Sequence, residues 1–123
     1  MKIRWTMALL ALLASSTALA YQDGDWVLAR WKSGEYWFPG VVKNQSGSQL
    51  TIAYDDGTRE KLSRDKVRPY NWKVGSRVEC RWQNGDDWYA GKITKIARDG
   101  VAISIAYDDG DREDTSTGAC RSK

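Results

Sequence analysis

Two pairs of adjacent carboxylates, Asp55-Asp56 and Asp108-Asp109, are the first candidates for chemistry in this 123-residue sequence. Paired carboxylates can carry out hydrolysis or bind calcium. Each pair, however, precedes a glycine, and Asp-Gly is first of all a hairpin-turn signal. Neighbouring strand residues point to opposite faces, and the acidic spacing of a calcium loop is absent. We therefore expect no catalytic residues and no metal site.

The sequence contains no histidine. This removes the side chain most often used for acid/base catalysis, the usual nucleophilic triads and the commonest metal ligand. We expect a protein that is not an enzyme and that needs no cofactor.

Tryptophan is the other residue type suited to recognition, because its ring face attracts cations. Trp31 and Trp82 each end an apolar run just before a glycine turn, so we expect them at the rim of a site. Trp37 and Trp88 are expected to be structural, since small domains use aromatic side chains to build enough core.

An internal duplication organises the chain from residue 24 onward. Six residues between Val27 and Gly40 recur at a constant spacing between Val78 and Gly91. After a two-residue difference in length, the hexapeptide Ile-Ala-Tyr-Asp-Asp-Gly at 52–57 recurs at 105–110. Such self-similarity indicates a tandem repeat of one structural unit.

Within each copy, apolar and polar residues alternate with the two-residue period of β-strands. No segment beyond residue 20 has a helical pattern. Turn sequences between the apolar runs contain glycine and asparagine, which tolerate positive φ. For the first copy we expect five short strands, at residues 26–31, 37–43, 49–54, 58–61 and 67–68.

Five short strands in about 50 residues must curl to bury one face and protect their edges, as in a small SH3-like barrel. The sequence therefore predicts an all-β protein with two tandem five-stranded barrels, at residues 21–70 and 71–123. The connection at 69–74 is short and carries Tyr70 and Trp72. We expect the two barrels to pack against each other.

The motifs of both copies resemble those of tandem Tudor domains. Each copy has Val-x-Ala-x-Trp (Val-x-Cys-x-Trp in the second copy), then a glycine turn, then Trp-Phe or Trp-Tyr, and then Tyr-Asp-Asp-Gly. The resemblance covers nearly all of the chain beyond residue 20. In Tudor modules, these positions form an aromatic cage for methylated lysine or arginine. The resemblance implies two ligand-binding cages, made of Trp31, Phe38, Tyr54 and Asp56 in the first copy and of Trp82, Tyr89, Tyr107 and Asp109 in the second.

The ligand that such cages imply is a cation with apolar substituents, because ring faces and a carboxylate both attract a weakly hydrated positive charge. The expected partner is a protein or peptide with a cationic or methylated side chain, or a small quaternary ammonium ion. Gly40 and Gly91 depart from the family, which usually has alanine there. Asp111 also departs, standing where some cages have an aromatic residue, so we expect the first cage to be the more complete.

Two other functions remain open. Single-stranded nucleic acid could stack on exposed aromatic rings while lysine and arginine hold its phosphates, although the sequence shows no continuous basic stripe. Alternatively, the barrels could be structural and dock onto a component of the cell envelope.

The first 20 residues have the pattern of a secretory signal peptide. Lys2 and Arg4 precede an apolar stretch at 7–14, and Ala-Leu-Ala at 18–20 predicts cleavage before Tyr21. The stretch is too short to cross a bilayer, so we expect a periplasmic or secreted protein with no transmembrane segment and no nuclear ligand. Loss of Lys2 and Arg4 lowers the net charge from +3 to about +1, which gives little long-range attraction for nucleic acid.

The two cysteines, Cys80 and Cys120, align with Ala29 and Val67 of the first copy. In an oxidising compartment a disulfide is the default expectation. The last strand of an SH3-like barrel lies beside the first, so Ala29 and Val67 should be neighbours. By the same alignment, we expect a disulfide between Cys80 and Cys120.

The first testable prediction concerns the acidic pairs. Calorimetric titration of the mature protein with calcium should show no binding, because Asp55-Asp56 and Asp108-Asp109 belong to turns and lack the ligand spacing of a calcium loop. Binding in the micromolar range would contradict this interpretation.

Overall fold

The structure, a computed structural model, describes residues 20–123. The predicted signal peptide therefore lies, apart from Ala20, outside the described residues. Within 20–123, no helix is both long and apolar enough to cross a membrane. The only helical segments in this range are four three-residue 3-10 turns, namely η1 (Trp31–Ser33), η2 (Arg64–Lys66), η3 (Trp82–Asn84) and η4 (Thr117–Ala119).

The first copy forms an antiparallel sheet with the strand order β4-β3-β2-β1-β5. Its strands are β1 (Trp26–Arg30), β2 (Trp37–Ser46), β3 (Gln49–Tyr54), β4 (Arg59–Ser63) and β5 (Val67–Pro69). Because β5 returns to pair with β1, the sheet curls into a small SH3-like barrel. All five predicted strands are present. β2 is longer than predicted, since a bulge between Val42 and Asn44 lets it continue to Ser46.

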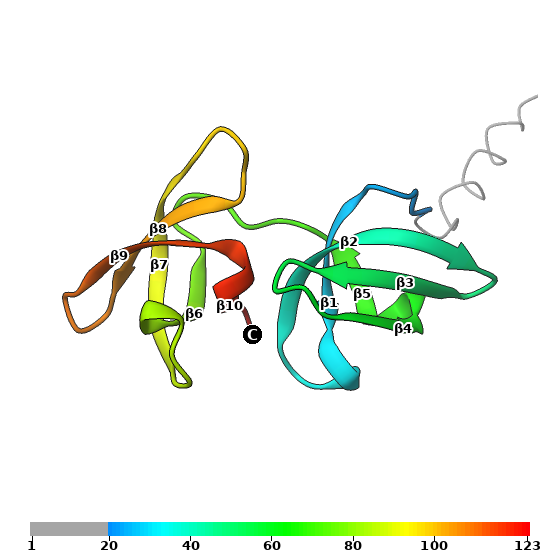
Figure 1. Cartoon of the computed structure of the whole chain (residues 1–123), viewed down its shortest axis with the longest axis horizontal. Coiled ribbons are helices and arrows are strands. Elements are labelled where there is room, and N and C mark those ends of the chain that lie inside the picture. Colours follow the sequence, from blue (N-terminus) through cyan, green and yellow to red (C-terminus); the bar gives the residue numbers. More distant parts are fainter. Residues whose placement is uncertain (1–19) are drawn as a thin grey trace, which may run out of the picture.

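The second copy repeats this arrangement, with the strand order β10-β6-β7-β8-β9. Its strands are β6 (Arg77–Arg81), β7 (Trp88–Ile96), β8 (Ala102–Tyr107), β9 (Arg112–Ser116) and β10 (Cys120–Arg121). Figure 1 shows the two barrels side by side, with the C-terminus between them. The prediction of an all-β protein with two five-stranded barrels is confirmed.

The turn after β1 gains its shape from residues other than its glycine. Lys32 and Ser33 have φ of 52° and 57°, whereas Gly34 has φ of −78°. The positive φ of this turn is therefore carried by the two residues that precede the glycine. Gly34 instead avoids a close contact, because a Cβ at this position would lie 3.1 Å from the Trp31 carbonyl oxygen.

Gly40 is required by the close approach of β3 to β2. A Cβ at Gly40 would lie 2.8 Å from the Ala53 oxygen and 3.0 Å from the Tyr54 Cα. Gly91 meets the same restriction in the second barrel, where the distance to the Ala106 oxygen would be 2.7 Å. Both copies thus share the same steric requirement for glycine at this position.

Each barrel has its own apolar core. The first is built from nine buried residues: Tyr21, Val27, Ala29, Val42, Leu50, Ile52, Tyr54, Leu62 and Val67. The second includes Trp72 of the connection and, from the first barrel, the fully buried Leu28, with Trp37 packed against it. Adjacent residues of β1 therefore serve different cores, since Val27 and Ala29 face one barrel and Leu28 faces the other.

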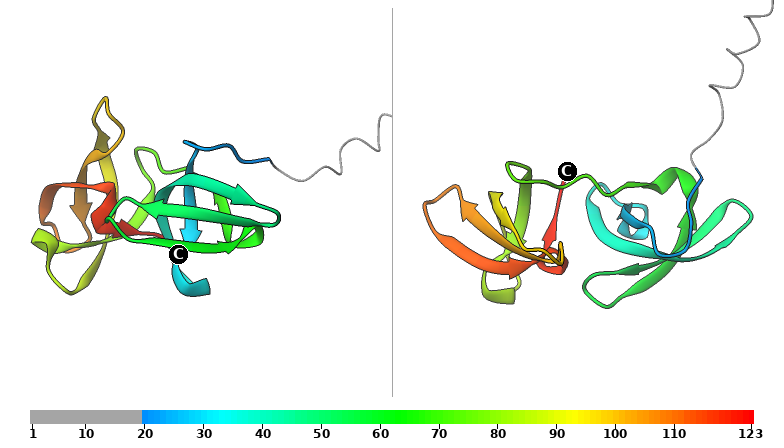
Figure 2. Two further views of the ribbon diagram at one scale, coloured as in Figure 1. Left: turned by 45° about the vertical axis from the view of Figure 1, so that its right-hand side comes forward. Right: turned by 90° about the horizontal axis from the view of Figure 1, so that it is seen from above.

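The two barrels are joined by direct hydrogen bonds as well as by apolar packing. Trp37 and Ser122 exchange both backbone hydrogen bonds, at 2.8 and 2.9 Å. The Trp72 Nε1 donates to the Ser122 hydroxyl at 3.2 Å, and the Thr117 hydroxyl donates to Asp55 at 2.6 Å. Both views in Figure 2 keep β10 next to the first barrel. The expected packing of the barrels against each other is present.

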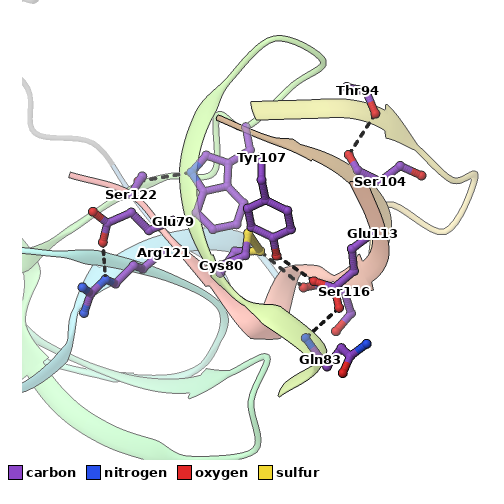
Figure 3. The surroundings of a disulfide bond; sticks show 12 residues. Glu79, Cys80, Gln83, Thr94, Ser104, Tyr107, Glu113, Ser116, Arg121 and Ser122 are labelled. Carbon is purple, nitrogen blue, oxygen red and sulfur yellow. Dashed lines mark hydrogen bonds and ion pairs between the residues drawn. A yellow bond between two sulfur atoms is a disulfide. The ribbon is translucent and has the colours of Figure 1, made fainter. Parts of the chain in front are cut away.

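The disulfide joins the first and last strands of the second barrel. Cys80 of β6 and Cys120 of β10 are cross-strand partners and are bonded to each other. Ala29 and Val67 are cross-strand partners at the same place in the first barrel. Figure 3 shows the bond beneath Tyr107. The predicted disulfide, and the strand placement behind it, are confirmed.

The second prediction concerns this bond. Replacing Cys80→Ala together with Cys120→Val reproduces the first barrel's pair and opens a loop with a sequence separation of 40. The free energy of unfolding of the second barrel should fall by about 3 to 4 kcal/mol, because the unfolded chain regains the entropy of that loop. Urea unfolding followed by circular dichroism measures this loss. Mass spectrometry that finds two free thiols in the oxidised protein would contradict the underlying assignment.

Candidate functional site

An aromatic concavity of about 330 Å³ lies at the end of the first barrel where β1 and β3 terminate. We refer to it as the first concavity. It brings together all four residues of the first predicted cage, which lie next to residues of the second barrel. Its lining consists of Trp31, Phe38, Tyr54, Asp56, Thr58, Arg81, Trp88 and Arg121.

Perpendicular ring contacts shape the first concavity. The ring of Trp31 meets that of Tyr54 at 5.6 Å and 86°, and Phe38 meets Tyr54 at 6.4 Å and 87°. Tyr54 is only 5% exposed and forms the floor, while Trp31 and Phe38 are half-buried walls. Edge-to-face packing of this kind fixes the orientation of each ring face.

A smaller concavity of about 150 Å³ occupies the corresponding place on the second barrel. We refer to it as the second concavity. It contains all four residues of the second predicted cage, together with Asp111, and is lined by Trp82, Tyr89, Tyr107, Asp109 and Asp111. Tyr107 is again the floor at 5% exposed, whereas Tyr89 is 45% exposed.

The acidic residue of each predicted cage is oriented by its hairpin turn. The Asp56 Oδ1 accepts hydrogen bonds from the backbone N–H of Thr58 at 3.0 Å and from its hydroxyl at 2.7 Å. The Asp109 Oδ1 accepts from the backbone N–H of Asp111 at 2.9 Å. These bonds hold each carboxylate beside the rings, in the turn that Asp-Gly predicts.

A glutamate links the floor of each concavity to the turn that carries its tryptophan. The Glu60 carboxylate accepts from the Tyr54 hydroxyl at 2.6 Å and from the backbone N–H of Lys32 at 3.1 Å. Glu113 accepts in the same way from Tyr107 at 2.6 Å and from Gln83 at 2.8 Å, as seen in Figure 3. No motif in the sequence indicates this role, although Arg-Glu recurs at the same place in both copies.

These surroundings keep both floor tyrosines neutral. Burial, followed by the hydrogen bond to Glu60 and the nearby negative charge, raises the pKa of Tyr54 well above its usual value. Burial and Glu113 raise the pKa of Tyr107 in the same way. Each hydroxyl therefore acts as a hydrogen-bond donor that positions the ring.

Trp37 and Trp88 occupy equivalent sequence positions but have different environments. Trp37 packs against the core of the second barrel, as expected for a structural residue. Trp88 instead lines the first concavity, with its ring 6.0 Å from that of Phe38. The structural interpretation did not anticipate this place for Trp88, which arises because the packing of the barrels puts its ring beside Phe38.

Two arginines also reach the first concavity from the second barrel. The Arg81 and Arg121 guanidinium carbons lie 4.6 and 4.2 Å from the centre of the Trp88 ring. Arg121 also lies 3.6 Å from the ring of Tyr36 and donates from Nε to Glu79 at 2.8 Å. No motif in the sequence indicates that these residues belong to the first barrel's site.

Neither concavity has the donor set of a metal centre. In the described part of the chain, no group of three or more histidine, cysteine, aspartate or glutamate side chains is placed to hold a metal ion. The arrangement of rings and single carboxylates can hold a cation by attraction, but it presents no nucleophile with an activating base.

No protein-family model and no curated protein sequence matches the chain. Among the solved structures that resemble its fold are two crystal structures. For Arabidopsis thaliana AGDP1 AGD34, the identity is 14%, the match covers 98% of this chain and 92% of that chain, and the TM-score is 0.40. For the ADCP1 tandem Agenet domain 3-4, the identity is 14%, the coverage is 96% and 89%, and the TM-score is 0.39.

The third prediction follows from the pKa shifts of the floor tyrosines. An unfolded chain loses tyrosine protons near pH 10, whereas folded Tyr54 and Tyr107 retain theirs to higher pH. The free energy of unfolding should therefore be insensitive to these groups below about pH 10 and fall above it. Urea unfolding at about pH 8 and pH 11 measures this fall in the free energy of unfolding. The fall should be smaller for the double variant Tyr54→Phe, Tyr107→Phe than for the unsubstituted protein.

Burial also raises the pKa of Tyr70, to about 12. Tyr70 is unchanged in the double variant, so its part of the pH dependence should remain there as an internal reference. If the free energy of unfolding falls as much in the double variant as in the unsubstituted protein, Tyr54 and Tyr107 are not the origin of the pH dependence.

Proposed function

We propose that this protein is a non-enzymatic binding module that holds alkylated ammonium groups in its aromatic concavities. Its ligand is a methylated or otherwise cationic side chain of a protein or peptide, or a small quaternary ammonium ion. The supporting observation is the recurrence of the same arrangement on both barrels, with three aromatic positions and one turn aspartate lining a concavity each time.

The attraction in such a site comes from ring faces and a carboxylate. Each ring face contributes about 0.5 to 2 kcal/mol toward a desolvated cation. An alkylated ammonium suits these sites because it is weakly hydrated and gains from apolar contact. Occupation of both concavities by one ligand chain would add avidity to weak individual affinities.

The lining charges favour the second concavity for a simple cation. Asp109 and Asp111 both line it, and no basic residue does. The first concavity combines Asp56 with the positive charges of Arg81 and Arg121. This ranking, with the second concavity favoured over the first, differs from the expectation that the first cage is the more complete. The reason is that Asp111 adds a second negative charge where some Tudor cages have a ring.

The proposal includes an extracytoplasmic location and two domains. The leader-like pattern of residues 1–20 and the disulfide between Cys80 and Cys120 both support an oxidising compartment. Each barrel has its own sheet and core, which supports the domain limits 21–70 and 71–123.

Single-stranded nucleic acid is the second candidate. Arg81, Trp88, Arg121 and Tyr36 form a continuous stack of guanidinium groups and rings, a combination that can hold phosphates and bases. The stack is confined to the junction of the barrels and covers a short length of chain. We therefore rank it below cation binding.

The fourth prediction tests the proposed function. Calorimetric titration with choline should show binding that Trp82→Ala weakens more than Trp31→Ala does, because the second concavity carries the larger negative charge. The two substitutions are matched, since these tryptophans occupy equivalent positions in the repeat.

A short single-stranded DNA serves as the competing ligand. DNA binding that requires Trp88, combined with no binding of choline, methylated lysine or methylated arginine, would replace the proposed function with the nucleic-acid alternative.

A further inference from the structure

We infer that the first concavity is specific for a compact zwitterion, in which an alkylated ammonium is joined to a carboxylate or a phosphate. The inference rests on the proposed function and assigns a different ligand class to each barrel. The ammonium occupies the space between the rings and Asp56, and the anion lies against Arg81 and Arg121.

The composition and size of the first concavity separate it from the second. Its volume of about 330 Å³ is more than twice the 150 Å³ of its counterpart. Its lining holds charges of both signs, whereas the second concavity has acidic groups alone. Arg121 is already paired with Glu79, but a ligand with one positive charge would leave Arg81 without an anion, and its repulsion would weaken binding.

Arg81 is the main candidate for the anion contact. Its side chain is exposed, and its guanidinium carbon lies over the Trp88 ring, 4.6 Å from the ring centre. Within residues 20–123 it forms no ion pair with a carboxylate. Stacking on a ring leaves the edge of a guanidinium available, and that edge matches the two oxygens of a carboxylate or phosphate.

Arg121 provides a second, more constrained donor. Its guanidinium carbon lies 3.6 Å from the centre of the Tyr36 ring and 4.2 Å from the centre of the Trp88 ring. The Nε atom is used by Glu79, and the two terminal nitrogens donate to no atom within residues 20–123. The packing fixes the plane of this group before a ligand binds, which lowers the entropy cost of an anion contact.

Asp56 supplies the opposite charge on the same lining. Its Oδ1 is used by Thr58, while its Oδ2 accepts no hydrogen bond from the described residues. Trp31, Phe38 and Tyr54 lie around it. The ammonium end of a zwitterion therefore meets the carboxylate and the rings, and the anionic end meets the arginines of the other barrel.

The duplicated arginines of the first barrel provide a natural comparison. Arg30 and Arg68 flank Trp37 at 4.6 and 4.2 Å, the same distances as for Arg81 and Arg121 around Trp88. Neither Arg30 nor Arg68 lines the first or the second concavity, because Trp37 packs toward the core of the second barrel. Arg68 instead lines a separate, more open hollow with Tyr21 and Asp65. Of the two equivalent stacks, the one around Trp88 therefore contributes to a predicted cage.

The fifth prediction compares three probes that share the trimethylammonium group: choline, glycine betaine and phosphocholine. The protein carries Tyr89→Ala, an exposed position whose loss disables the second concavity with little cost to the core. Calorimetry at low salt should show at least one zwitterion binding about tenfold more tightly than choline, as expected for a charge-assisted contact.

Arg81→Gln in this background should abolish the preference and increase the affinity for choline, because a repelling charge is removed. The matched control, Arg30→Gln, changes the equivalent arginine outside the concavity and should retain the preference. A gain in choline affinity also shows that the Arg81→Gln protein is folded. Choline binding as tightly as both zwitterions, or a preference that survives Arg81→Gln, would overturn the inference.

The proposed function is tested separately by choline binding to the Trp31→Ala variant, in which the second concavity is intact. Choline binding to that variant, with no zwitterion preference in the first concavity, overturns the inference alone. An Arg81-dependent preference for a zwitterion supports the inference, even where choline fails to bind the second concavity.

Discussion

The two backbone hydrogen bonds between Trp37 and Ser122 fix how the barrels meet, and most features of the candidate site depend on that junction. Such a pair sets both the distance and the register of the segments it joins. Ser122 directly follows Arg121, so the bonds hold Arg121 against the first barrel. The same junction brings Trp88 to Phe38 and lets Leu28 complete the second core. A small barrel buries little surface alone, and sharing a core compensates for this.

The junction also breaks the symmetry of the duplication. The repeat places a tryptophan between two arginines in each copy, with nearly identical geometry. One of these stacks faces a core and the other faces a concavity, because the two copies present different faces to each other at this junction. The result is two concavities with related rings but linings of different charge.

Within a barrel, a few polar contacts hold the aromatic rings in place. Glu60 connects the Tyr54 hydroxyl to the backbone N–H of Lys32, so hydrogen bonds tie β3, β4 and the turn that carries Trp31 together. A carboxylate that accepts two such bonds resists displacement, because its removal would leave a mostly buried hydroxyl without a partner. The equivalent Glu113 shows that this support belongs to the repeat itself.

The sequence alone determined the features that depend on local pattern and on the duplication. Alternating residues and Asp-Gly turns located the strands, the repeat aligned Cys80 with Ala29, and the Tudor resemblance grouped the residues of each concavity. Strand period and turn chemistry act over a few residues, so they can be read without coordinates.

Only the tertiary structure decided which barrel residues serve the neighbouring barrel. Trp88, Arg81 and Arg121 lie at positions whose counterparts, Trp37, Arg30 and Arg68, have the same sequence context and a different role. The difference arises from packing between segments far apart in the chain. Two equivalent sequences carry no local signal of which copy's face will be covered, because the contact geometry of the assembled barrels makes that choice.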